Sequence, residues 1–118
     1  MKRDMDLVRR ILLEVEKRSP EEMDRPLQFE GHSDQEITYH VRILHEAGLI
    51  TALDFSSSGG EQWQPVSLTW EGHDFLDASR DDSQWSKARA IIKEKAGTVS
   101  FAVLKALLVS LARKAVGL

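Results

Sequence analysis

Apolar side chains recur at helical spacing over residues 4–18. They repeat with the period of an α-helix and would share one of its faces: Leu7, Val8, Ile11, Leu12 and Val15. Ser19-Pro20 follows, and a residue before proline avoids the helical region of the backbone. The pattern therefore predicts a first helix that ends before this dipeptide and offers an apolar stripe to a core.

The period of the pattern then changes. Residues 26–30 alternate between polar and apolar side chains, which predicts a short edge strand. Ser33 and Glu36 have the spacing of a capping box, in which each side chain binds the backbone amide of the other residue. We expect a second helix over residues 34–47, ended by Gly48 in the left-handed conformation.

A hairpin is predicted directly after this second helix. A Ser/Gly cluster at residues 56–60 separates two segments, residues 49–55 and 63–69, which we expect to pair as antiparallel strands. Three more helical segments follow, and the first of them starts at Thr69 or Trp70. The predicted fold class is α+β: a winged-helix-like domain, in which helices carry a β-hairpin wing, with additional C-terminal helices.

The chain is long enough for one domain overall, with residues 1–80 as a winged-helix-like core and residues 81–118 as a C-terminal helical extension. Its last helix, over residues 101–116, is apolar around most of its circumference: Phe101, Leu104, Leu107, Leu108, Leu111, Ala115 and Leu118. This coverage exceeds the stripe that a surface helix needs. The helix is therefore expected to bury part of its surface in a homodimer. The alternatives are packing between helices 4–18 and 83–96 of one chain, and peripheral membrane contact.

Charge is distributed unevenly along the chain. The net charge of −3 combines +2 in residues 1–18, −11 in residues 19–82 and +6 in residues 83–118. The basic C-terminal third could form an anion-binding face. Alternatively, the acidic and basic regions attract each other or are solvated separately.

The absence of cysteine excludes a disulfide framework and fits a reducing cytosol. Residues 1–6 lack the apolar core and the cleavage site of a signal peptide. The apolar stretch near the C-terminus is interrupted by Lys105, Arg113 and Lys114, so it is too polar for a membrane span. We therefore expect a cytoplasmic protein with no membrane partner.

Two resemblances support this fold. The run from Thr38 to Ile50 resembles the recognition helix, and its exit into the wing, of the MarR-like and ArsR-like winged-helix repressors. Almost the whole chain is similar to an uncharacterised family of small bacterial and prophage hypothetical proteins, a domain of unknown function. The runs that carry this similarity are Met1–Arg9, Tyr39–Ile50 and Leu68–Asp77. The resemblances imply a winged-helix fold and bring no established activity. One departure is that no positioning helix is evident before Ser33, so the helix-turn-helix pair is expected to be incomplete.

In a winged-helix repressor, the helix over residues 34–47 would enter the major groove of DNA. Its polar residues include base-reading types and are the candidate nucleic-acid contacts: Gln35, Thr38, Tyr39 and Arg42. Against this, Asp34, Glu36 and Glu46 would repel phosphate. The wing tip carries Glu61 and no Lys or Arg.

No catalytic, metal or cofactor site is predicted, and we expect no enzyme. The histidines lack metal-ligand spacing, since His40 and His45 lie on different helix faces. Asp81 and Asp82 could suggest a paired-carboxylate site, but a helix break followed by a helix cap explains them better. Three tryptophans could form a stacking platform, but core and rim packing is the more typical use of such rings: Trp63, Trp70 and Trp85.

Two functions remain open. The first is a DNA-binding, transcription-regulator-like module that acts on double-stranded DNA. The second is a protein-interaction adaptor that uses the winged-helix scaffold without nucleic acid, and for which a phage origin is open. A nucleic-acid face is expected if the basic residues of 83–118 share a surface with Arg9, Arg10 and Arg42. If they lie opposite, the acidic helix and wing are expected to bind protein.

Overall fold

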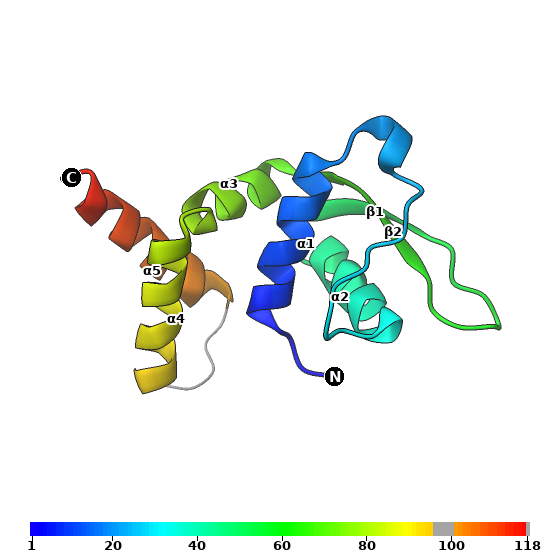
Figure 1. Cartoon of the computed structure of the whole chain (residues 1–118), viewed down its shortest axis with the longest axis horizontal. Helices are drawn as coiled ribbons and strands as arrows, with labels where there is room; N and C mark the ends of the chain where they lie inside the picture. The colour runs from blue at the N-terminus through cyan, green and yellow to red at the C-terminus, as the bar shows by residue number, and fades with distance from the viewer. Residues whose placement is uncertain (96–100, 118) are drawn as a thin grey trace. The chain divides into compact units, whose positions relative to one another are not determined.

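The structure is a computed structural model that describes residues 1–95 and 101–117, and the side chains of all of these except residues 94 and 95. The chain divides into two compact units, residues 1–73 and 74–118. Within the described residues the elements follow in this order (Figure 1): α1 (Met5–Lys17), the 3₁₀ turn η1 (Pro20–Glu22), α2 (Asp34–Glu46), β1 (Ile50–Asp54), β2 (Trp63–Leu68), α3 (Trp70–Ser79), α4 (Asp82–Lys95) and α5 (Phe101–Ala115). The predicted α+β class, with a helix directly before a hairpin, is confirmed.

Helix α1 begins where predicted because Asp4 caps it. The Asp4 carboxylate accepts hydrogen bonds from the backbone amides of Asp6 at 3.0 Å and Leu7 at 3.1 Å. All five apolar residues of the predicted stripe are buried. The helix ends at Lys17, before the Ser-Pro dipeptide as expected, and supplies one wall of the core of the first unit.

Helix α2 starts at a serine cap and ends at a glycine, as predicted. The Ser33 hydroxyl accepts a hydrogen bond from the backbone amide of Glu36 at 3.1 Å. The Glu36 carboxylate pairs with the His32 ring. Of the two hydrogen bonds of a capping box, the structure therefore shows the one from the Glu36 amide to Ser33. The Glu36 carboxylate instead contacts His32, the residue before the cap. Gly48 has a φ of 77°, the left-handed conformation that stops the helix.

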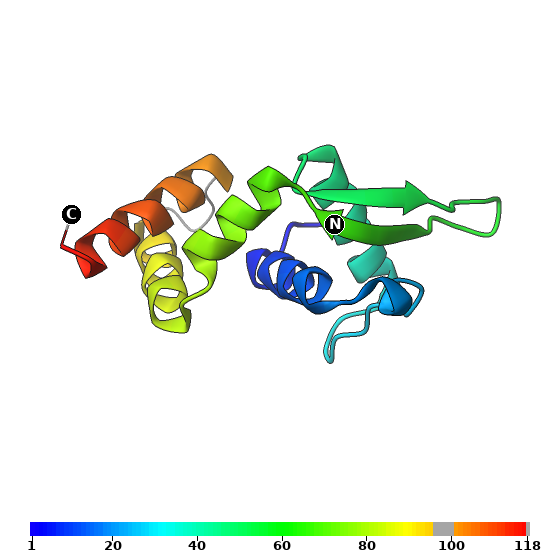
Figure 2. The ribbon, with the colours of Figure 1, turned by 90° about the horizontal axis from the view of Figure 1, so that it is seen from above.

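The hairpin is antiparallel, as predicted. Ile50 pairs with Leu68, and Asp54 pairs with Trp63. The register shifts between Thr51 and Ala52, where β2 carries a bulge next to Pro65. A proline cannot donate to a strand ladder and is tolerated at such an irregularity. The hairpin projects beyond α2, with its serine- and glycine-rich loop at the far end (Figure 2).

The edge strand predicted over residues 26–30 is wrong, because this segment forms no strand. Arg18 donates hydrogen bonds to the backbone carbonyls of Arg25 and Pro26, which occupies acceptors that a ladder would need. The Phe29 ring lies 4.9 Å from the Arg10 guanidinium. The alternating pattern therefore reflects separate side-chain contacts. The absence of a full positioning helix is confirmed, since only η1 lies between α1 and α2.

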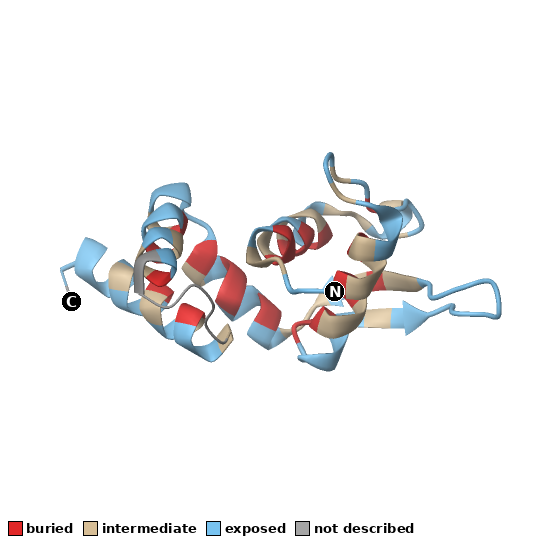
Figure 3. Cartoon of the chain, turned by 90° about the horizontal axis from the view of Figure 1, so that it is seen from below, coloured by how far each residue is buried: buried red, intermediate tan, exposed pale blue. Residues whose placement is uncertain are grey.

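The core of the first unit lies between α1, α2 and the base of the hairpin. The buried faces of its two helices are drawn red in Figure 3. A histidine sits among the apolar side chains, since His40 is fully buried. Its Nε2 accepts a hydrogen bond from the backbone amide of Asp4, and its Nδ1 lies 2.8 Å from the carbonyl of Glu36. This ring therefore joins the start of α1 to the middle of α2.

A glycine lets the start of α3 approach the end of α2. A Cβ built on Gly72 would lie 2.0 Å from the backbone oxygen of Leu49, closer than any side chain allows. The Thr69 side chain accepts from the Gly72 amide and donates to the carbonyl of Gly48. The first turn of α3 is thus fixed to the chain that enters β1.

The core of the second unit is built around aromatic rings. Phe75 of α3 is fully buried and meets Trp85 edge-on at 6.3 Å between ring centroids. Phe101 lies 4.6 Å from the same phenylalanine ring. On α5, Leu104 and Leu108 are buried, whereas its opposite face is exposed. Within this unit α5 packs against α4. Leu118, which was grouped with the apolar residues of this helix, lies outside the described residues.

Candidate functional site

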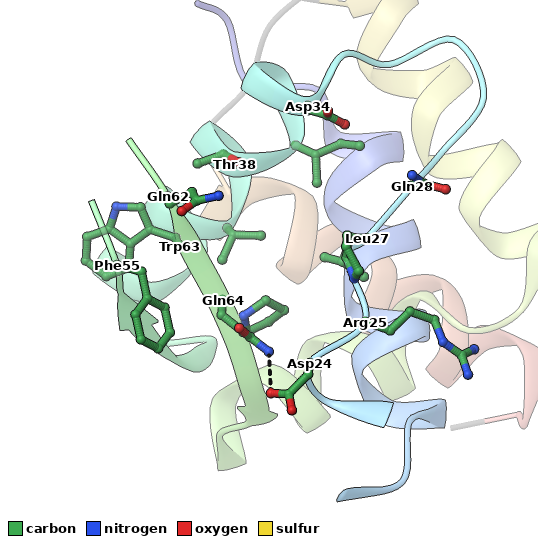
Figure 4. Close-up of a pocket in the computed structure, with 14 residues that line it drawn as sticks. Asp24, Arg25, Leu27, Gln28, Asp34, Thr38, Phe55, Gln62, Trp63 and Gln64 are labelled. Atoms are coloured by element: carbon green, nitrogen blue, oxygen red, sulfur yellow. Dashed lines mark hydrogen bonds between the residues drawn. The ribbon is translucent and has the colours of Figure 1, made fainter. Parts of the chain in front are cut away.

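A groove of about 590 Å³ opens in the first unit between α2, β2 and the loop before α2 (Figure 4). Its lining comes from the loop before α2, from α2 and from the hairpin: Asp24, Arg25, Pro26, Leu27, Gln28, Asp34, Ile37, Thr38, Val41, Phe55, Gln62, Trp63, Gln64 and Pro65. Volumes of this size are typical of ligand-binding clefts. The groove is therefore the candidate functional site.

The groove has an apolar floor and a partly exposed aromatic wall. Leu27, Ile37, Val41 and Pro65 are all buried. Phe55, at the end of β1, is 56% exposed. An exposed large apolar ring beside an apolar floor is a surface on which another apolar group can be buried.

The loop wall of the groove is held from both sides. On one side the Arg18 guanidinium donates to the carbonyls of Arg25 and Pro26. On the other side the Gln64 amide donates to the carbonyl of Met23 and to the Asp24 carboxylate. Figure 4 draws the contact between Gln64 and Asp24. Two long side chains thus position a segment that has no regular structure of its own.

The aromatic wall is fixed by a ring contact with α2. The Trp63 and His45 rings lie 5.3 Å apart between centroids, at an angle of 38°. Trp63 is half-buried and lines the groove from β2. The contact restrains the indole of Trp63 on this side of the groove.

The rim of the groove is acidic. Within the part of the chain that the structure describes, neither Asp24 nor Asp34 forms an ion pair with a cation. The cation of the lining, Arg25, lies 3.3 Å from the Glu22 carboxylate. The lining therefore presents two carboxylates whose charge no neighbouring cation balances.

The four predicted nucleic-acid contacts do not share one environment. Gln35 is exposed, whereas Thr38 lines the groove. Tyr39 and Arg42 are half-buried, and the guanidinium lies 5.2 Å from the tyrosine ring centroid. The structure thus brings Tyr39 and Arg42 together and assigns Thr38 to the groove.

Arg42 is held by two carboxylates. Its Nη1 atom lies 3.3 Å from Glu46 on the same helix, and its Nε atom lies 2.6 Å from Glu61 in the loop between β1 and β2. A guanidinium between two carboxylates has its charge balanced locally. A phosphate or a base that contacts Arg42 would compete with these two carboxylates for the guanidinium.

Sequence reasoning missed most of the groove. Leu27, Phe55 and Gln64 carried no local signal, because their proximity depends on the fold of the loop against β2. Among the tryptophans, Trp85 is buried as expected. Trp70 is 81% exposed, so the expectation of core or rim packing is wrong for this residue.

In residues 1–95 and 101–117, no three His, Asp or Glu side chains gather as they would around a metal ion. Over the same residues, no helix has both the length and the apolarity needed to cross a membrane.

The chain matches one family model and one curated protein. A family model described as "Hypothetical protein (DUF2513)" matches residues 2–98. A protein of Haemophilus influenzae (strain ATCC 51907 / DSM 11121 / KW20 / Rd), named "Uncharacterized protein", is 38% identical over 106 residues. The match covers 89% of this chain and 90% of that protein. No solved structure matches the chain.

Proposed function

This chain belongs to the DUF2513 family of hypothetical proteins, and we propose that it is a winged-helix module that binds another protein through the groove beside α2. The order of helix and hairpin supports the winged-helix assignment, since α2 runs directly into β1 and β2. The ion pairs of Arg42 with Glu46 and Glu61 favour a protein partner over DNA.

The observation that carries this proposal is the pairing of Arg42 with Glu46 and Glu61. A DNA-reading helix needs cations that can meet phosphates or base edges. Arg42 is the one Lys or Arg within α2, and both ion pairs compete with DNA for it. The remaining charges of the helix, Asp34 and Glu36 in its first turn, repel phosphate.

The groove supplies what a protein ligand requires. Its buried floor and exposed Phe55 ring can cover an apolar side chain. Its wall is ordered in advance by Arg18 and Gln64, which lowers the entropy cost of binding. A groove made from one helix and one strand accepts a short segment of a partner without a large flat interface.

Selection of a displayed random-peptide library on the full chain tests this proposal. Thr38→Trp places a bulky ring in the groove, whereas Gln35→Trp places the same ring on an exposed position of α2. Peptides recovered on the wild-type chain should lose binding to Thr38→Trp and retain it with Gln35→Trp, provided both variants keep the wild-type circular dichroism spectrum. Equal binding to both variants, or no recovered peptide, contradicts the proposal.

DNA binding is the second candidate, and the charge of the second unit favours it. Residues 74–118 contain eight Lys/Arg against five Asp/Glu, and the α5 segment has no acidic residue. Titration of random duplex DNA at low salt tests this candidate. If α2 is the contact, Arg42→Ala should weaken binding, and Asp34→Asn or Glu36→Gln should strengthen it. Unchanged affinity in all three variants would mean that α2 does not contact DNA.

A further inference from the structure

We propose that the groove selects an extended segment in which an apolar side chain is flanked by lysine or arginine. This inference rests on the proposed protein-binding function and adds the chemistry of the partner. It follows from charge complementarity with the rim, from the apolar floor, and from the side-chain amides that line the groove.

The carboxylates at the rim favour a cationic partner. Asp34 and Asp24 lie toward opposite ends of the groove in Figure 4. No described cation pairs with either carboxylate, and Arg25 is already matched by Glu22. The whole first unit has the same sign, since residues 1–73 contain fourteen Asp/Glu against eight Lys/Arg. An acidic field around the groove attracts a basic segment and repels an acidic one.

The floor calls for an apolar side chain between those charges. Ile37 and Val41 of α2 line the groove together with Leu27 and Pro65, and all four are buried. Phe55 offers an exposed ring at the side. An apolar anchor there would be removed from water, while flanking lysines could stay hydrated near the two aspartates.

The lining amides favour an extended backbone. Gln28 and Gln62 are exposed, and each side-chain amide offers both a donor and an acceptor. An extended segment has free peptide N–H and C=O groups that such amides can bind. A helical segment uses most of these groups internally. The groove is therefore matched to an extended ligand.

Fluorescence polarisation with synthetic peptides tests the inference. The probes share one central leucine in a glycine/serine background, and two flanking positions carry lysine, serine or glutamate at varied spacing. For the best spacing we expect the affinity order lysine, serine, glutamate, with the lysine advantage reduced by added salt. Asp24→Asn and Asp34→Asn should each weaken the lysine peptide about two- to fivefold, as for an exposed ion pair, and weaken the serine peptide less.

Glu30→Gln is the matched control, because it makes the same change in net charge at an exposed position outside the groove lining. It should weaken the lysine peptide less than either aspartate variant does. If lysine and serine peptides bind equally, or if Glu30→Gln has the same effect as the aspartate variants, the inference is overturned and protein binding stands. If no peptide binds the folded wild-type chain, both proposals fail.

Discussion

The His40 ring accepts a hydrogen bond at Nε2 from the backbone amide of Asp4, at 2.9 Å, across 36 positions of sequence. The other ring nitrogen, Nδ1, lies 2.8 Å from the carbonyl of Glu36 and carries the ring hydrogen in this arrangement. One fully buried side chain thus satisfies two backbone groups on two helices. The Asp4 amide would lose this partner if the ring were removed, whereas the Glu36 carbonyl lies within the α2 helix ladder.

His40→Leu is therefore expected to lower the free energy of unfolding by about 1–3 kcal/mol, because it leaves a backbone donor unsatisfied in a partly buried position. Urea denaturation measures the change. His45→Leu is the control, since His45 is exposed and its ring contacts Trp63 at the start of β2. Equal loss in both variants would show that the two hydrogen bonds of His40 contribute nothing specific.

Gly72→Ala is expected to destabilise the chain although alanine is the better helix former. Its methyl group would overlap the backbone oxygen of Leu49, so the start of α3 must shift. Overpacking of this kind costs about 1–3 kcal/mol. Gly59→Ala at the hairpin tip is the matched control, where the new Cβ meets only the Ser57 hydroxyl at 3.6 Å. Thermal unfolding that ranks the two variants equally would contradict this account.

Ser19 lowers the pKa of Glu22. The carboxylate accepts hydrogen bonds from the Ser19 backbone amide at 3.3 Å and from its hydroxyl at 3.0 Å, and Arg25 adds a smaller Coulombic contribution. Hydrogen bonds to the charged form favour it, so this stabilisation is present above the ordinary pKa of a glutamate. It is lost as the pH falls through the lowered pKa.

Ser19→Ala removes the hydroxyl contact and leaves the backbone contact, so the pKa of Glu22 should rise part of the way toward its ordinary value. The carboxyl carbon shift of Glu22, followed by NMR against pH, measures it. Ser19→Thr keeps a hydroxyl and should keep the pKa lowered. An unchanged pKa in the alanine variant would assign the whole effect to the other contacts.

The two faces of α5 predict different mutational effects. Leu108 is fully buried, so Leu108→Ala should cost about 2–5 kcal/mol of stability. Val109 is exposed within a single chain, so Val109→Glu should leave the fold intact. If the exposed face forms the predicted homodimer, sedimentation should give a dimer for the wild type and a monomer for Val109→Glu. A wild-type monomer at micromolar and at high concentration refutes the dimer.

Local sequence signals predicted the regular elements better than the site. The Ser33 cap, the Gly48 stop and the Ser/Gly loop depend on neighbouring residues, and all three mark element ends as predicted. The edge strand failed because alternation alone does not supply a paired neighbour. The groove depends on contacts such as Gln64 with Asp24, which lie 40 positions apart.

Arg42 shows the same limit within one helix. Its position on α2 follows from helical periodicity, and its pairing with Glu46 follows from the spacing of four residues. Its ion pair with Glu61 depends on how the hairpin folds back toward α2. Whether the Arg42 guanidinium is paired therefore depends partly on Glu61, a residue outside α2.

Glu46 and Glu61 also determine how easily this scaffold could change partners during evolution. Exchanging both for glutamine would remove two negative charges and release Arg42, while the buried side chains of α2 stay as they are. A surface change of this size alters attraction to phosphate without requiring a new core. Within the family, we expect gain or loss of nucleic-acid affinity to follow the residues at these two positions, while the fold persists.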